Sequence, residues 1–352
     1  MTSGPVRHKG ERLLHLGFAT RTPGECRIAL MLKRTLISCL TLAALAAAPA
    51  AARAADAVVV PGATPNDLTA LDGTVVWSTG KFPNYTLMQR TPDGTVAQVA
   101  GAPVANYRSI DLGHNANGDL VLTYLRCEGN KNCKAVSDDL QGKRTFYTKL
   151  VPRRCELTSA PSRWNSRVAY GLSCDKLRGK PNVHDRTRTG LFVRKGSAPA
   201  KRLNRPKDAR KFGIDHVRYV DLRGTNVGAV VSDIYSYAFS QTVNGSNLRS
   251  TFIAGSEGES DEQVVGAATG MGGLFWTLVD SSHTGDPNEA RVARLSRSGC
   301  SEFERLINPP GPNEADGFLA EGLAVDGTTL YLFVPGTGIV THEFKPMRMR
   351  CV

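Results

Sequence analysis

The sequence consists of short apolar runs separated by turn residues. The clearest unit is Glu321–Val334, in which Asp326-Gly327 separates two apolar segments. An Asp-Gly pair in this setting is among the strongest local signals for a β-hairpin. Looser copies of the pattern begin at Thr69, Ile110 and Ala267. The chain is therefore predicted to repeat one hairpin-based unit.

From residue 57 onward, segments rich in β-branched and aromatic residues alternate with turns, and no amphipathic helix is predicted. The strands that open a repeat are predicted near Thr69, Ser109, Arg167, Tyr219, Val264 and Glu321. Most gaps between them are about 50 residues, at the long end for propeller blades. We therefore predict an all-β fold, a six-bladed β-propeller of four-stranded antiparallel blades around a channel. Ala57–Val60 precedes the first blade and is expected to complete the last one, closing the ring.

Two units share a longer pattern, Arg108-Ser-Ile-Asp-Leu112 and Arg218-Tyr-Val-Asp-Leu222. Strand alternation places Ile110 and Leu112 on one face and Asp111 on the other. Together with the hairpin motif at 322–332, this pattern resembles the secreted six-bladed TolB-like propellers and, more loosely, NHL-type blades. The resemblance covers residues 57–350 and implies an architecture only, because propellers host hydrolases, lyases and binding scaffolds.

Residues 1–54 are predicted to be an N-terminal extension and secretory signal peptide, ahead of a single propeller domain at 55–352. Met31-Leu-Lys-Arg34 gives a basic start, Thr35–Ala48 an apolar run, and Ala52-Arg53-Ala54 a small-residue cleavage site. The run is shorter than the roughly 20 residues that span a bilayer. No transmembrane segment is expected in the mature chain, and the expected localisation is secreted or periplasmic. Met31 is an alternative start, so whether residues 1–30 are translated stays open.

Export also bears on the cysteines, because an even number in an exported chain favours disulfides. The mature chain has six: Cys127, Cys133, Cys155, Cys174, Cys300 and Cys351. We predict neighbour pairing, Cys127–Cys133, Cys155–Cys174 and Cys300–Cys351. Zinc is the alternative, but the paired C-x-x-C spacing of zinc sites is missing. No metal and no cofactor are predicted.

Candidate catalytic groups are the acidic residues and the histidine expected near the channel mouth: Asp111, Asp215, His216, Glu262 and Glu321. Asp215-His216 puts a carboxylate beside an imidazole, as acid–base chemistry requires. The acidic residues cannot be matched one by one to the metal ligands of lactonase-type propellers. The sequence has no nucleophile elbow, phosphate-binding loop or dinucleotide-binding motif. The alternative that these side chains are structural loop carboxylates stays open.

Charge is the most informative functional signal. The whole chain has a net charge of +12, and residues 126–211 contain 23 basic and 7 acidic residues, a net charge of +16. This segment, called the basic sector below, is predicted to bind anions. Its candidate anion-binding residues are Arg153, Arg154, Lys201, Arg202 and Lys207. A solvated basic face without a partner is the alternative.

These features favour an exported, non-catalytic binding or scaffold propeller of the bacterial cell envelope. The expected partner is an anionic envelope polymer or an acidic protein surface. Nucleic acid is not expected, because the sector lacks the regular aromatic spacing of a nucleic-acid platform. The alternative function is a propeller hydrolase, lactonase or lyase with an acidic/His site at the channel mouth. Convergence of several catalytic candidates over the channel would favour the enzyme.

Overall fold

The structure, a computed structural model, describes residues 57–352 except 130, 148–149, 178–179, 212–215, 233–234, 256–262, 281–289, 297–299, 307–319, 347 and 352. The described residues belong to one unit, Arg53–Val352. The predicted signal peptide lies outside them, and the domain boundary at residue 55 stays a prediction. Within the described part, no helix is long and apolar enough to cross a membrane.

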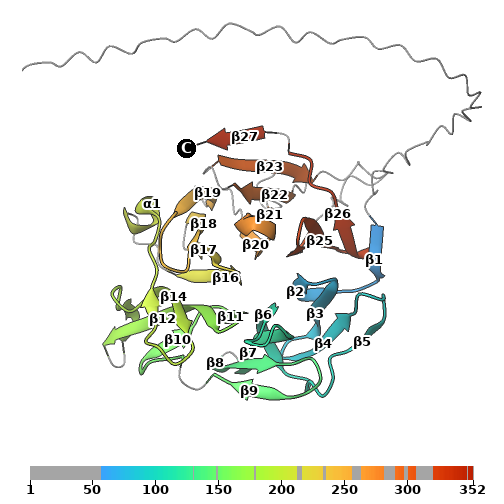
Figure 1. Cartoon of the computed structure of the whole chain (residues 1–352), viewed down its shortest axis with the longest axis horizontal. Helices are drawn as coiled ribbons and strands as arrows, with labels where there is room; N and C mark the ends of the chain where they lie inside the picture. The colour runs from blue at the N-terminus through green and yellow to red at the C-terminus, as the bar shows by residue number, and fades with distance from the viewer. Residues whose placement is uncertain are drawn as a thin grey trace, which may run out of the picture. The chain divides into compact units, whose positions relative to one another are not determined.

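The described strands form five sheets with almost entirely antiparallel pairing, arranged as a propeller-like ring (Figure 1). Sheet A comprises β2 (Pro65–Leu71), β3 (Thr74–Lys81), β4 (Asn84–Arg90) and β5 (Val96–Gln98). Sheet C comprises β16 (Val217–Arg223), β17 (Asn226–Ser232), β18 (Tyr235–Thr242) and β19 (Arg249–Gly255). Sheet D comprises β20 (Gln263–Thr269), β21 (Phe275–Asp280), β22 (Ala290–Leu295), β23 (Cys300–Leu306) and β27 (Arg348–Cys351). Sheet E comprises β24 (Gly322–Asp326), β25 (Thr329–Val334), β26 (Gly338–His342) and β1 (Ala57–Pro61).

Sheet B has ten strands and lies between sheets A and C in the ring (Figure 1). Its first half is β6 (Asn106–His114), β7 (Leu120–Glu128), β8 (Lys131–Asp138) and β9 (Arg144–Phe146). Its second half is β10 (Cys155–Leu157), β11 (Ser162–Trp164), β12 (Arg167–Leu177), β13 (Lys180–His184), β14 (Gly190–Lys195) and β15 (Lys201–Arg202). Among the described residues, the helical elements are the short helix α1 (Lys207–Lys211) and the 3-10 turn η1 (Met271–Gly273).

The prediction of six separate four-stranded blades is not confirmed, because the described strands form four separate blades and the ten-stranded sheet. The two halves of sheet B are joined by a parallel bridge between His114 of β6 and Trp164 of β11. Gly113 permits this approach, since a Cβ at this position would lie 1.9 Å from the carbonyl oxygen of Arg163. The all-β class and the propeller-like arrangement are confirmed.

The N-terminal strand closes the ring as predicted. β1 pairs antiparallel with β26, placing Ala57 opposite Thr341, and the two strands lie side by side in Figure 1. Val60 is 5% exposed and packs in a cluster with Trp77 of sheet A and Ile339 of sheet E. The first and last sheets therefore share one core.

The Asp-Gly hairpin prediction is also confirmed, with the turn one residue later than expected. Asp326 is the last residue of β24 and pairs with Thr329, leaving Gly327-Thr328 as the two-residue loop. Gly327 has φ 62°, a conformation that costs glycine little. The Asp326 carboxylate accepts a hydrogen bond from the Gly73 N–H at 2.6 Å, so the last hairpin is tied to the first.

Disulfides join Cys127 to Cys133 and Cys155 to Cys174, as predicted. The first closes the β7–β8 turn, and the second crosses the β10–β12 pairing, where the two cysteines are register partners. Cys300 is also disulfide-bonded and lies opposite Cys351 in the β23–β27 pairing. Its pairing with Cys351 stays a prediction.

Candidate functional site

The channel side of the ring is lined by the first strands of the sheets. β2, β6, β16, β20 and β24 surround a cavity of about 40 Å³. A water molecule needs roughly 10–15 Å³ of such space, so the cavity has room for about three waters. The channel is therefore nearly filled by the side chains that line it.

Arg223 is the only cation among the described residues that line this cavity. From the end of β16 its guanidinium reaches Asp221 at 3.2 Å and Asp111 of β6 at 3.6 Å. It also donates a hydrogen bond to the carbonyl oxygen of Leu112, and it lies 5.8 Å from the ring centre of Trp164. Arg223 thus links sheet C to sheet B across the channel.

Burial and mutual repulsion raise the pKa values of the channel carboxyls. Desolvation is the main cause for Asp111, whose pKa also rises through the charge of Asp221. The pKa of Asp221 is raised by burial, while Arg223 and the Thr269 N–H lower it. Burial raises the pKa of Asp67 to about 6. Oδ2 of Asp111 is buried without a hydrogen-bond partner, which fits a carboxyl that resists ionisation.

Polar side chains in and beside the channel connect neighbouring sheets by accepting hydrogen bonds from backbone N–H groups. The Asp67 carboxylate accepts from Ile110 N–H at 2.7 Å, and Asp221 accepts from Thr269 N–H at 2.6 Å. A third link runs from Leu222 N–H to the Ser162 hydroxyl at 2.7 Å. Each link satisfies a backbone donor of the next sheet or half-sheet along the chain, so these side chains hold the ring together.

The structure brings two of the five catalytic candidates to one cavity, since both Asp111 and Glu321 line the channel. His216 is exposed at the start of sheet C, where its carbonyl accepts the Ser232 N–H. Asp215 and Glu262 lie outside the described residues. In the described part of the chain, no group of three or more His, Cys, Asp or Glu side chains could hold a metal ion.

The sequence interpretation missed Asp67, Asp221 and Arg223 as members of the channel cluster. A signal for Asp221 was present, because it occupies the position of Asp111 in the shared pattern that ends at Leu112 and Leu222. Asp67 and Arg223 occur outside that pattern. Nothing local in the sequence marks them.

A larger cavity lies within the basic sector, beside β12 and β14. Its volume is about 490 Å³, and its walls include Leu150, Tyr170, Leu172, Phe192, Arg188 and Arg194. We call it the β12–β14 cleft. Unlike the channel, it offers cations beside an apolar wall.

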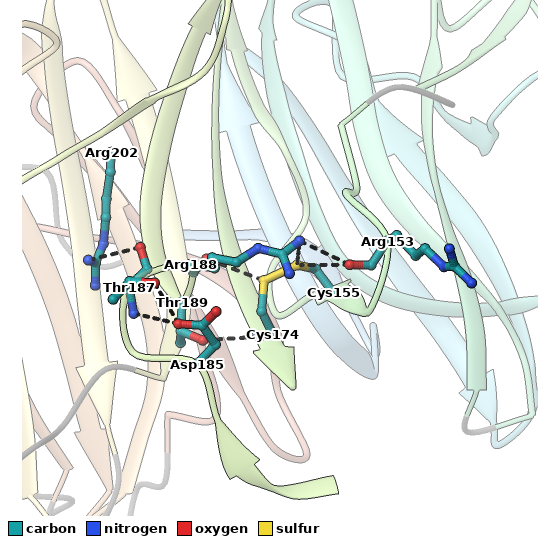
Figure 2. The surroundings of a disulfide bond; sticks show 8 residues. All are labelled: Arg153, Cys155, Cys174, Asp185, Thr187, Arg188, Thr189 and Arg202. Carbon is teal, nitrogen blue, oxygen red and sulfur yellow. Dashed lines mark hydrogen bonds between the residues drawn. A yellow bond between two sulfur atoms is a disulfide. The ribbon is translucent and has the colours of Figure 1, made fainter. Parts of the chain in front are cut away.

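The five predicted anion-binding residues divide into two groups. Arg153, Arg154 and Lys207 are exposed. Lys201 donates to the Asn244 carbonyl, and Arg202 donates to the carbonyls of Thr187, at 3.2 Å, and Arg186, at 2.6 Å. The contact from Arg202 to Thr187 is visible in Figure 2. Lys201 and Arg202 therefore also fix neighbouring loops.

No protein-family model and no curated protein matches the chain. Similar solved structures include TolB from Acinetobacter baumannii, with 11% identity over 66% of this chain and 52% of that one, at a TM-score of 0.41. The polysaccharide lyase Uly1 has 10% identity over 81% of this chain and 91% of its own, at a TM-score of 0.44. A GH43_1 enzyme from Xanthomonas citri has 11% identity over 68% and 90%, at a TM-score of 0.38. The chain spans about half the length of that TolB structure. These identities and TM-scores are too low to transfer an activity.

Proposed function

We propose that this chain is an exported, non-catalytic binding propeller of the bacterial cell envelope, whose basic sector binds an anionic polymer or an acidic protein surface. The segregation of charge carries this proposal. Residues 126–211 have a net charge of +16, and their strands from β8 to β15 all belong to sheet B. One sector of the ring therefore carries an excess of positive charge, which attracts anions from a distance and raises association rates.

The exposed cations suit contact with a polyanion. Arg153, Arg154 and Lys207 are exposed, and none of them forms an ion pair with another described residue. Arginine presents a planar fork of donors that matches carboxylate and phosphate groups. Each exposed contact is weak, so useful affinity requires several contacts at once, as a polymer or an extended acidic surface provides.

The channel supports a structural role better than catalysis. Its cavity of about 40 Å³ is far smaller than the roughly 300–1,000 Å³ of ordinary ligand sites. Asp67 and Asp221 already bind backbone N–H groups of the neighbouring sheets. We therefore favour the binding function over a hydrolase, lactonase or lyase.

The same proposal includes a six-bladed ring, in which each half of sheet B counts as one blade. Its support is the position of the buried clusters, because one of them lies between these halves and contains Leu125 of β7 and Tyr170 of β12. The clusters at the other junctions have the same character. The disulfides fit an extracellular or periplasmic protein, which supports export.

The test is chromatography of the mature chain on immobilised dextran sulfate with a salt gradient. Retention should weaken steeply with salt, because the Debye length falls from about 10 Å at 0.1 M to about 3 Å at 1 M. The triple variant Arg153→Gln, Arg154→Gln, Lys207→Gln should elute at clearly lower salt than the wild type. These substitutions spare the Arg153 carbonyl, and they leave Lys201 and Arg202 in place.

The matched control removes the same charge outside the basic sector, by Lys81→Gln, Arg218→Gln and Lys345→Gln, all at exposed positions. It should elute close to the wild type. Equal shifts for the two triple variants would mean that net charge alone governs retention. If the wild type shows no salt-sensitive retention, the proposal is wrong and the basic sector is a solvated face without a polyanionic partner.

A further inference from the structure

We propose that the β12–β14 cleft is a separate site for a small organic anion with an aromatic or aliphatic body, such as an aryl-alkyl carboxylate. The inference goes beyond polymer binding at the exposed cations and rests on different residues. The cleft volume of about 490 Å³ lies within the range of small-molecule sites.

The apolar part of the cleft is preformed. Leu150, Tyr170 and Leu172 are 4%, 1% and 2% exposed, so packing fixes them, and most of the apolar surface open to a ligand belongs to other lining residues such as Phe192. Phe192 on β14 is half-buried and lies beside Tyr170, with ring centres 6.1 Å apart and an interplanar angle of 20°. A ligand ring or alkyl chain placed here would bury more of Phe192 without reorganising the wall.

The charged part is equally well positioned. Arg188 donates through one terminal nitrogen to the Arg153 carbonyl at 3.0 Å and contacts Cys155 Sγ at 3.5 Å (Figure 2). Arg194 donates from Nε to the Gly196 carbonyl at 3.0 Å. A guanidinium has five N–H donors, and both contacts of Arg188 come from one terminal nitrogen, so Arg188 retains donors for an anion. Because protein contacts hold both arginines, binding would cost little side-chain entropy.

The charges of the residues that line the cleft favour an anionic ligand. Among the described residues that line the cleft, two are arginine and none is aspartate or glutamate. The nearby Asp185 carboxylate accepts from the backbone N–H of Thr187 at 3.0 Å and from its hydroxyl at 2.6 Å. The pKa of Asp185 is lowered mainly by these bonds and less by the charge of Arg188, so Asp185 offsets part of the charge of one of the two arginines. An apolar wall beside two positioned guanidiniums therefore suits a ligand that is apolar at one end and anionic at the other.

Three probes of related shape test this by calorimetry: 3-phenylpropionate, the neutral 3-phenylpropanol, and propionate, which lacks the ring. We expect 3-phenylpropionate to bind with a Kd at or below about 10 mM, from roughly 0.3 kcal/mol per ligand atom. The alcohol and propionate should each bind at least about tenfold more weakly, because the alcohol lacks the negative charge and propionate lacks the ring. No binding of 3-phenylpropionate at this concentration would overturn the proposal, as would equal affinity for the alcohol.

Variants assign the binding to the cleft. Arg194→Gln and Phe192→Ala should each raise the Kd for 3-phenylpropionate about tenfold, whereas Arg194→Lys should retain more of the affinity. Circular dichroism and the melting temperature verify folding, and Arg188→Gln is the substitute variant if Arg194→Gln unfolds. The triple variant at Arg153, Arg154 and Lys207 should bind the probe like the wild type. If only that triple variant lost probe binding, the probe site would lie outside the cleft. If the wild type were not retained on dextran sulfate, the polymer-binding proposal would fail, but the cleft should still bind the probe.

Discussion

Replacing Arg223 with methionine should destabilise the ring strongly, and the loss should depend on pH. The side chain of Arg223 is 10% exposed and contacts two carboxyl groups that are 10% and 4% exposed, those of Asp111 and Asp221. Removing one partner of a buried ion pair typically costs about 3–5 kcal/mol, because an uncompensated charge remains. The hydrogen bond to the Leu112 carbonyl is lost as well. We therefore expect the free energy of unfolding to fall by about 3–5 kcal/mol near neutral pH.

The pH dependence follows from the direction of the pKa shifts. The pKa values of Asp111 and Asp221 are raised by burial, and Arg223 lowers both. In Arg223→Met the pKa values of both carboxyls must rise further. At a pH between the unfolded and folded pKa values, the folded variant therefore binds more protons than the unfolded chain. Where the folded state binds more protons, stability increases as the pH falls. The loss should therefore be largest at about pH 7.5 and smaller at about pH 5.

Urea unfolding followed by tryptophan fluorescence measures this loss at both pH values. The double variant Asp111→Asn, Arg223→Met supplies the control, because asparagine removes a buried ionisable group at nearly constant shape. It should recover about 1 kcal/mol or more at neutral pH relative to Arg223→Met alone. A loss below about 1 kcal/mol, or one of the same size at both pH values, would refute the electrostatic account of the channel.

Three further outcomes are expected. Burial raises the Asp67 pKa to about 6, so stability should fall as the pH rises through that value, and Asp67→Asn should flatten this part of the melting-temperature profile. Replacing Cys155 and Cys174 by serine opens a loop with a sequence separation of 19 and should cost about 3 kcal/mol by calorimetry; an unchanged melting temperature would contradict this. Val60→Asp should lower the melting temperature by several degrees, whereas Val58→Asp, at a position 48% exposed, should have little effect; equal effects would show that β1 does not seal the ring.

Local chemistry explains which parts of the fold were predictable. A hairpin depends on a few adjacent residues, so Asp326-Gly327 was sufficient to predict β24 and β25. The closing strand was also predictable, since Ala57–Val60 stands alone before the first repeat. The third predicted opening strand, near Arg167, was misplaced, because β12 starts there and the three-residue β11 precedes it. A strand of three residues is too short to show an alternating pattern.

The candidate sites were only partly predictable, because they depend on contacts between sheets. Asp111 was singled out from sequence, whereas Arg223, which is 112 positions further along the chain, was not. In the basic sector, composition predicted the excess of cations but not which of them support loops. Arg202 donates to two backbone carbonyls of the 185–188 turn, a role that depends on folded geometry.

The departure of sheet B from the regular repeat explains why the channel is an unsuitable place for a ligand. Asp111 and Asp221 occupy equivalent positions, but the next-but-one residue is Gly113 in β6 and Arg223 in β16. Glycine lets β11 approach β6 closely enough to join the two halves of sheet B. Arginine fills the remaining space and reaches back to Asp111 and Leu112. One repeat position thus joins the two halves of sheet B, while its counterpart supplies the side chain that narrows the channel to about 40 Å³.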